Sequence, residues 1–120
     1  MERLRKRADF LAASCGIKIP AATFVMQMRD RSDHGPVRVG FTVSKKVGNA
    51  VERNRVRRRL RELVRLASED ALQPGHDYVL VGRRAALSAN FAQLTSDYGK
   101  ALARTRKQRQ ALKAKIPRTG

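Results

Sequence analysis

The residues of this chain that are best suited to chemistry are cations that could bind phosphate groups. Nine lysine and arginine residues lie between Lys45 and Arg65, and only Glu52 and Glu62 oppose them. A solvated helix face usually interleaves both signs four residues apart, whereas repeated cations repel one another. Most of these cations are arginine, whose planar guanidinium can donate two hydrogen bonds to one phosphate group. The segment therefore predicts a binding surface for a polyanion.

The residues around these cations predict one long amphipathic helix over about 50–71. Asn49 is a good N-cap, and Glu52, three residues later, completes the pattern of a capping box. Apolar residues then recur at helical steps and define one face, namely Val56, Leu60, Leu63, Val64, Ala67 and Ala71. Arg53 lies near this apolar face and is expected to be half-buried. The opposite face is expected to carry Asn54, Arg55, Arg57, Arg58, Arg59, Arg61 and Arg65.

Composition narrows the class of protein and the kind of partner. A chain of 120 residues is expected to form one domain, and 42% hydrophobic residues favour a folded chain over a disordered basic tail. A net charge of +17 favours nucleic acid as the partner. A membrane surface is disfavoured because the basic helix lacks tryptophan. The single cysteine forms no internal disulfide, and no apolar run reaches about 18 residues, so a cytoplasmic protein is expected.

Further strands and helices are expected on either side of the basic helix. They are a short helix over 7–13, an edge strand over 17–19, strands over 22–29, 37–44 and 78–83, and a last helix beginning near Ser88 or Asn90. The turn between the second and third of these strands predicts an antiparallel hairpin. The strand at 78–83 is apolar nearly throughout and is expected at the centre of the sheet.

This order predicts an α+β fold, a two-layer sandwich whose three- to four-stranded mixed sheet packs with about three helices. One RNA-binding domain is expected over 1–104, followed by a basic, flexible tail over 105–120, because no acidic residue follows Asp97.

Residues that could catalyse a reaction are sparse. The ten acidic residues are scattered, and none pair at a strand end to hold two metal ions. His34 and His76 lie in predicted turns, where histidine is usually solvated, and Cys15 more often packs as a small apolar residue. The sequence has neither a zinc-ligand pattern nor a glycine-rich phosphate loop. These observations predict a nucleic-acid-binding protein with no catalytic or metal-binding residues of its own.

The basic segment also resembles a known family. Ser44 to Val51, read as Ser-Lys-Lys-Val-Gly-Asn-Ala-Val, and the Arg53-Asn54-Arg55 block after it resemble the signature of the protein subunit of bacterial ribonuclease P. The resemblance extends from Leu4 to about Leu102. It implies an accessory subunit of an endoribonuclease whose catalyst is an RNA that uses magnesium, so that the protein alone is inactive and holds no metal. It also implies a left-handed strand–helix–strand crossover, which nothing else in the sequence indicates.

The resemblance further implies two binding sites. The first grips ribonuclease P RNA and comprises Lys45, Lys46, Asn49, Arg53, Asn54, Arg55, Arg57, Arg58, Arg59, Arg61 and Arg65. The second is a shallow cleft for the single-stranded 5′ leader of precursor tRNA and comprises Phe10, Ser14, Phe24 and Gln27. Phe10 matches a base-stacking aromatic, whereas Phe24 could equally belong to the core.

Ser14 and Gln27 stand where relatives often carry aromatic residues. This departure predicts weaker stacking and a larger electrostatic share in leader binding, with Arg29 and Arg38 as helpers.

The predicted function is removal of the 5′ leader of precursor tRNA, with ribonuclease P RNA and precursor tRNA as partners and with no membrane and no obligate protein partner. A ribosomal-type RNA-binding protein or a basic DNA-binding module stays open as the alternative, and a protein-only nuclease is disfavoured by the missing metal-binding carboxylates.

Overall fold

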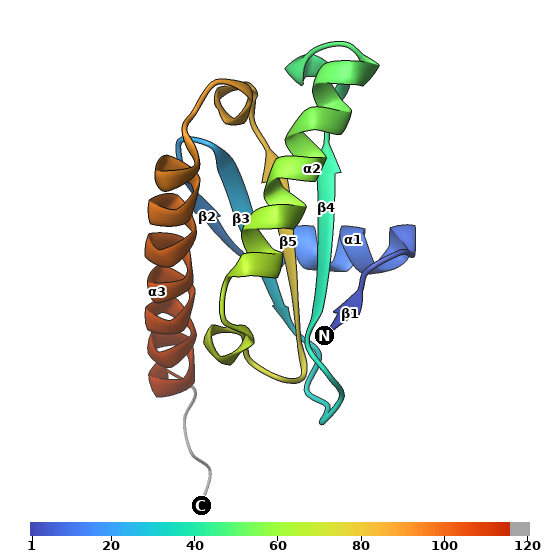
Figure 1. Ribbon diagram of the computed structural model, residues 1–120. Helices are drawn as coiled ribbons and strands as arrows, with labels where there is room; N and C mark the ends of the chain where they lie inside the picture. The colour runs from blue at the N-terminus through green and yellow to red at the C-terminus, as the bar shows by residue number, and fades with distance from the viewer. Residues whose placement is uncertain (116–120) are drawn as a thin grey trace, which may run out of the picture.

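A five-stranded mixed sheet with helices on both faces forms the computed structural model, which describes the backbone of residues 1–115 and the side chains of residues 1–112 (Figure 1). The strands are β1 (Glu2–Arg3), β2 (Ile17–Pro20), β3 (Phe24–Asp30), β4 (Arg38–Val43) and β5 (His76–Gly82). The helices are α1 (Arg7–Ser14), α2 (Ala50–Leu66) and α3 (Phe91–Lys115), with short 3₁₀ turns η1 (Lys45–Val47), η2 (Glu69–Ala71) and η3 (Arg84–Leu87). The predicted α+β class, mixed sheet and three helices are confirmed, and the two-residue β1 brings the strand count above the expected three to four.

The strand order is β1-β4-β5-β3-β2. β5 pairs antiparallel with β3 and parallel with β4, so it lies between them. The predicted hairpin of β3 and β4 is therefore wrong, although β5 does occupy the expected central place. Almost every residue of β5 is buried, as expected for an apolar strand in the middle of a sheet that is covered on both faces.

The connection from β4 through α2 to β5 is left-handed. In Figure 1, β4 and β5 point upward, β5 lies to the left of β4, and α2 crosses in front of the sheet. Parallel strands joined through a helix almost always make the opposite, right-handed turn. The handedness implied by the family resemblance is thus confirmed, and it places α2 over the centre of the sheet.

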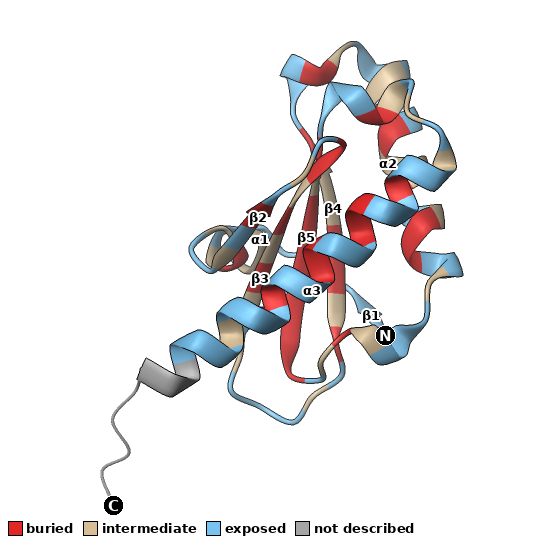
Figure 2. Ribbon diagram, turned by 90° about the vertical axis from the view of Figure 1, so that its left-hand side faces the viewer, coloured by how far each residue is buried: buried red, intermediate tan, exposed pale blue. Residues whose placement is uncertain are grey.

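Side chains alternate between the two faces of the sheet and form two apolar clusters. The larger cluster lies between the sheet and the helices α2 and α3, and it contains Phe24, Met26, Tyr78 and Leu80 (Figure 2). The smaller cluster lies beneath α1 on the other face, with Val79 at its centre. None of the helices that the structure describes is long and apolar enough to cross a membrane.

Two helix ends differ from the sequence prediction. α2 ends at Leu66 instead of near residue 71, because Ala67 adopts an extended backbone and the Ser68 side chain caps η2. α3 begins as expected, with Asn90 accepting a hydrogen bond from the Gln93 backbone, but it continues to Lys115. Thr105 is only 1% exposed, so the helix is still packed where a tail was expected to begin.

The division into a domain over 1–104 and a tail over 105–120 stays a prediction. Its boundary falls within a continuous helix in the described part of the chain, and residues 116–120 lie outside the described residues.

Candidate nucleic-acid interface

The start of α2 is fixed by the predicted capping box. The Asn49 side chain accepts a hydrogen bond from the Glu52 backbone nitrogen at 2.9 Å, and the Glu52 carboxylate accepts one from the Asn49 backbone nitrogen at 3.1 Å. This exchange satisfies two backbone donors that a helix start otherwise leaves without partners. Of the predicted RNA-binding residues, Asn49 is therefore already engaged by the helix it begins.

A free cationic face runs from η1 along the outer side of α2. The exposed predicted residues are Lys45, Lys46, Asn49, Asn54, Arg55, Arg58, Arg61 and Arg65. Within the described residues, five of these cations make no side-chain hydrogen bond or ion pair, namely Lys45, Lys46, Arg55, Arg58 and Arg61. Arg65 instead donates to Glu62 at 2.9 Å, a hydrogen bond that lowers the pKa of that carboxyl.

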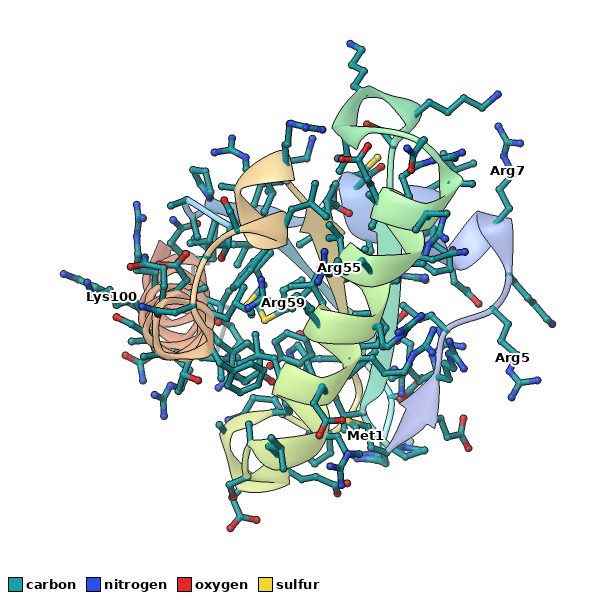
Figure 3. All side chains as sticks on the ribbon, turned by 45° about the horizontal axis from the view of Figure 1, so that its top comes forward. Met1, Arg5, Arg7, Arg55, Arg59 and Lys100 are labelled. Carbon is teal, nitrogen blue, oxygen red and sulfur yellow. The ribbon has the colours of Figure 1, made fainter. Side chains whose placement is uncertain are left out.

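The other cations of α2 are partly buried. Arg53 is half-buried, as expected, and its Nε has no partner among the described residues. Arg57 is also half-buried and donates to the Asn54 side chain at 2.8 Å. The prediction that Arg59 lies on the outer face is wrong, because its guanidinium donates to the carbonyls of Ala86, Leu87 and Ala89 (Figure 3).

Arg59 therefore ties α2 to the segment that follows β5. A second arginine, Arg84, makes the reverse connection, since it donates to the Val47 carbonyl at 2.6 Å and lies 3.5 Å from the Glu52 carboxylate. Together these two arginines hold η1, α2 and η3 as one surface. Arg84 was not singled out from the sequence, because its partners Glu52 and Val47 lie 32 and 37 residues away along the chain.

A cleft lies between α1 and the opposite face of the sheet. It has a volume of about 590 Å³, and Phe10, Ser14 and Gln27 all line it. Its floor comes from Thr42, Val79 and Val81, while Leu11, Arg5 and Arg7 complete its wall and rim. Figure 3 shows Arg5 and Arg7 projecting outward on the α1 side, and both are exposed. The structure thus brings together three of the four residues predicted for this cleft.

Phe24 does not belong to the cleft, so its assignment there is wrong. It is 0% exposed and belongs to the cluster beneath α2 and α3. Neighbouring residues of a strand point to opposite faces, and Gln27, three positions later in β3, faces the cleft. The core alternative for Phe24 is the one that the structure supports.

Glycine at position 40 lets the Phe10 ring reach the sheet. A Cβ at this position would lie 2.7 Å from the ring, closer than side chains tolerate. The Ser14 hydroxyl donates to the Leu11 carbonyl at 2.6 Å, within the helix. The cleft therefore offers the Phe10 ring, a partly engaged hydroxyl and an amide.

A buried carboxylate, that of Asp77, lies on the face of the sheet that α1 covers and binds two arginine side chains. Asp77 is 0% exposed, and Arg38 grips both of its oxygens at 2.8 Å, while Arg31 donates to one of them. Burial raises the pKa of Asp77, but hydrogen bonds from Arg38 and Arg31 outweigh it and leave the pKa below its ordinary 3.8. The carboxylate therefore stays ionised, in charge-assisted hydrogen bonds of the strong kind.

This cluster also reaches α1. Asp9 lies 3.4 Å from Arg38 and 3.8 Å from Arg29, and Arg29 also lies 3.8 Å from Asp77. Arg29 and Arg38, predicted to help bind a leader, are thus engaged by carboxylates and do not line the cleft. Their role in the structure is to hold α1 against the sheet.

Within the described residues, no group of three His, Cys, Asp or Glu side chains could hold a metal ion. His76 is buried at the start of β5 and not solvated in a turn, with its Nδ1 2.9 Å from the Pro74 carbonyl oxygen. Cys15 is exposed, so the prediction that it packs as a small apolar residue is wrong.

Comparison with known proteins gives a consistent result. A family model described as ribonuclease P matches residues 1–106. The chain is 50% identical over 101 residues to the ribonuclease P protein component of Gluconacetobacter diazotrophicus, covering 83% of this chain and 87% of that relative. It is 48% identical over 102 residues to the protein of the same name from Caulobacter vibrioides, covering 84% and 68%.

Solved structures show the same fold. The ribonuclease P protein of Staphylococcus aureus superposes with a TM-score of 0.71 at 26% identity, covering 88% of this chain and 95% of that one. The ribonuclease P protein of Thermotoga maritima gives a TM-score of 0.71 at 28% identity, covering 87% and 97%.

Proposed function

This chain belongs to the ribonuclease P protein family, which acts in tRNA 5′ processing, and we propose that it is an accessory subunit that binds a catalytic RNA through the outer face of α2. The observation that carries the proposal is the set of exposed cations on η1 and α2 that have no partner in the described part of the chain: Lys45, Lys46, Arg55, Arg58 and Arg61. The partner that follows from the family is ribonuclease P RNA.

α2 is expected to recognise the shape and the phosphate groups of the RNA, and not its base sequence. Contacts to phosphates fix register and orientation but carry no sequence information. The deep, narrow major groove of double-helical RNA also hides its bases from side chains. A row of exposed arginines on one rigid helix suits such a target, because each guanidinium can grip one phosphate group with two hydrogen bonds.

We propose that the cleft beneath α1 takes the single-stranded 5′ leader of precursor tRNA. Phe10 offers a ring on which a base can stack, and the Gln27 amide offers hydrogen bonds. Arg5 and Arg7 at the rim add positive charge beside the chain of phosphates. These rim arginines take the electrostatic role that the sequence suggested for Arg29 and Arg38.

The magnesium of the holoenzyme is assigned to the RNA in this proposal. Magnesium prefers carboxylate oxygens and water as ligands. Asp9 and Asp77, on the same side of the sheet as the cleft, face arginines, and Asp97 accepts hydrogen bonds from Thr23. These three carboxylates are already engaged by other side chains, which supports leaving the magnesium to the RNA, and no step of the reaction is assigned to a metal held by this chain.

Reconstitution tests the proposed function. The full-length chain alone is expected to leave precursor tRNA uncut, and to restore cleavage by its cognate RNA at a magnesium concentration where that RNA alone is slow. The readout is the 5′ leader released over time. Magnesium-dependent cleavage by an RNA-free preparation that an Asp or Glu substitution abolishes would contradict the proposal.

Replacing Phe10 by alanine tests the cleft. Loss of one stacked base is expected to weaken binding of leader-bearing precursor tRNA to the holoenzyme about 10-fold. The affinity for mature tRNA, which has no leader, is expected to stay unchanged. Equilibrium binding of the two tRNAs at one salt concentration measures both.

Leu11→Ala is the matched control, because Leu11 lines the same cleft and is 57% exposed but has no ring to stack. It is expected to change the precursor affinity much less. An equal loss for precursor and mature tRNA in Phe10→Ala would contradict the assignment of the leader to this cleft.

A further inference from the structure

The outer face of α3 carries a second row of cations that the proposed function does not use. Lys100, Arg104 and Lys107 are all exposed. At about 100° per residue they fall within roughly 60° of arc on the helix, opposite the side that carries Tyr98. Tyr98 is buried against the sheet, and so is Thr105. The row therefore points away from the core.

This row has no internal partner in the described part of the chain. None of its three side chains takes part in a hydrogen bond or an ion pair there. No acidic residue follows Asp97 in the sequence, and Asp97 itself is buried and accepts hydrogen bonds from Thr23. Like charges three and four residues apart destabilise a helix, so the row costs stability within the molecule.

The dipole of the helix does not account for the row. A helix end favours cations only within its last turn. α3 runs to Lys115, so Lys100, Arg104 and Lys107 all lie more than two turns before that end. An ordinary solvated face would interleave acidic residues, as the Glu62–Arg65 pair does on α2.

The row is also separate from the cationic face of α2. Both helices cover the same face of the sheet, but α3 lies at the β2 side and α2 at the β4 side (Figure 1). Lys100 points away from Arg55 and Arg59 of α2 (Figure 3). One RNA segment lying along α2 would therefore not cover α3.

We propose that the outer face of α3 binds the phosphate backbone of a second double-helical segment of the same RNA. Lys100 and Lys107 are spaced by about 10 Å along the helix axis, so the row contacts neighbouring phosphates along one strand. Such contacts position the RNA without reading its sequence. This inference rests on the proposed function, since it adds a contact to the RNA that α2 binds.

The test compares two double lysine variants of the full-length chain. Lys100→Ala/Lys107→Ala removes two charges from the row, and Lys6→Ala/Lys18→Ala removes two exposed lysine charges outside α2 and α3. The measurement is the dissociation constant for a transcript of ribonuclease P RNA between about 50 and 200 mM salt. The α3 variant is expected to lower the salt slope by about 2, and the control by less than half of that.

Equal slopes for the two variants overturn the inference while leaving the proposed function intact. A wild-type chain that shows no preference for this RNA over unrelated RNA of equal length overturns both. The α2 variant described in the Discussion separates these results, because it loses affinity whenever the proposed function holds.

Discussion

Replacing Arg55, Arg58 and Arg61 together by alanine is expected to weaken binding of ribonuclease P RNA on the order of 100-fold at low salt. All three side chains are exposed, and none has a hydrogen bond or an ion pair within the described residues. Each lost phosphate contact is expected to lower the salt slope of binding by about 1. A salt titration of the dissociation constant therefore measures how many of the three arginines contact phosphate.

The matched control is Arg55→Lys/Arg58→Lys/Arg61→Lys. Lysine keeps the charge but replaces the planar fork by a point charge. This variant is expected to keep most of the salt slope and to lose part of the affinity. Because the three residues are exposed, the thermal unfolding of all variants should match that of the wild type. A triple alanine variant with the wild-type slope would show that α2 is not the RNA contact.

Replacing Asp77 by asparagine is expected to lower the free energy of unfolding by about 3 kcal/mol. Asp77 is fully buried and accepts hydrogen bonds from Arg31 and Arg38. Removing its charge leaves these two guanidinium groups without their shared counter-ion in a partly buried site. Denaturant titration of the wild type and the variant measures the difference.

Asp33→Asn is the matched control. Asp33 also accepts hydrogen bonds from Arg31, but its side chain is half exposed. Water and salt screen such a surface pair, so the control is expected to leave stability nearly unchanged. Similar losses for the two variants would contradict a special role for the buried carboxylate.

The same carboxylate predicts a pH dependence. The pKa of Asp77 is lower in the folded chain than its ordinary 3.8, so the unfolded chain binds its proton first as the pH falls. Asp77 therefore contributes its full stability above about pH 4, and the contribution is lost as the pH falls through the lower, folded pKa. Acid unfolding of Asp77→Asn is expected to be less steep than that of the wild type below about pH 4.

Features set by neighbouring residues could be predicted from the sequence. The capping box needs only Asn49 and Glu52, three residues apart, and it is present as predicted. The apolar stripe of α2 also follows from local spacing, and its predicted core residues from Val56 to Val64 are buried. Features of this kind depend only on residues that are close together in the sequence, so the sequence alone predicts them.

Features that depend on distant partners could not be predicted. Arg59 looks like any other cation on the helix in the sequence, because the carbonyls of Ala86 and Ala89 that it binds lie 27 and 30 residues later. The hairpin prediction failed for the same reason, since the strand that lies between β3 and β4 is β5, which follows the whole β4–α2 segment in the sequence. The left-handed turn of the β4–α2–β5 crossover was likewise implied only by the family resemblance and not by any residue pattern.

The two phenylalanines Phe10 and Phe24 show that the alternation of side chains along a strand helps to separate cleft residues from core residues. Phe10 and Phe24 look equally suited to stacking when considered as single residues, but only Phe10 faces the cleft. Phe24 shares its face of β3 with Met26 and Met28, both buried in the same cluster. The apolar alternation of that strand is therefore the local pattern that indicates a core position for Phe24.

The identity of the RNA that the chain binds in cells tests the central claim most directly. The measurement is purification of the tagged full-length chain and sequencing of the bound RNA and DNA, for the wild type and for Arg55→Ala/Arg58→Ala/Arg61→Ala. We predict that one large structured RNA, the ribonuclease P RNA, is enriched with the wild type and lost with the variant. Enrichment of ribosomal RNA or duplex DNA, or enrichment that the variant leaves unchanged, would contradict the claim that α2 holds the catalytic RNA.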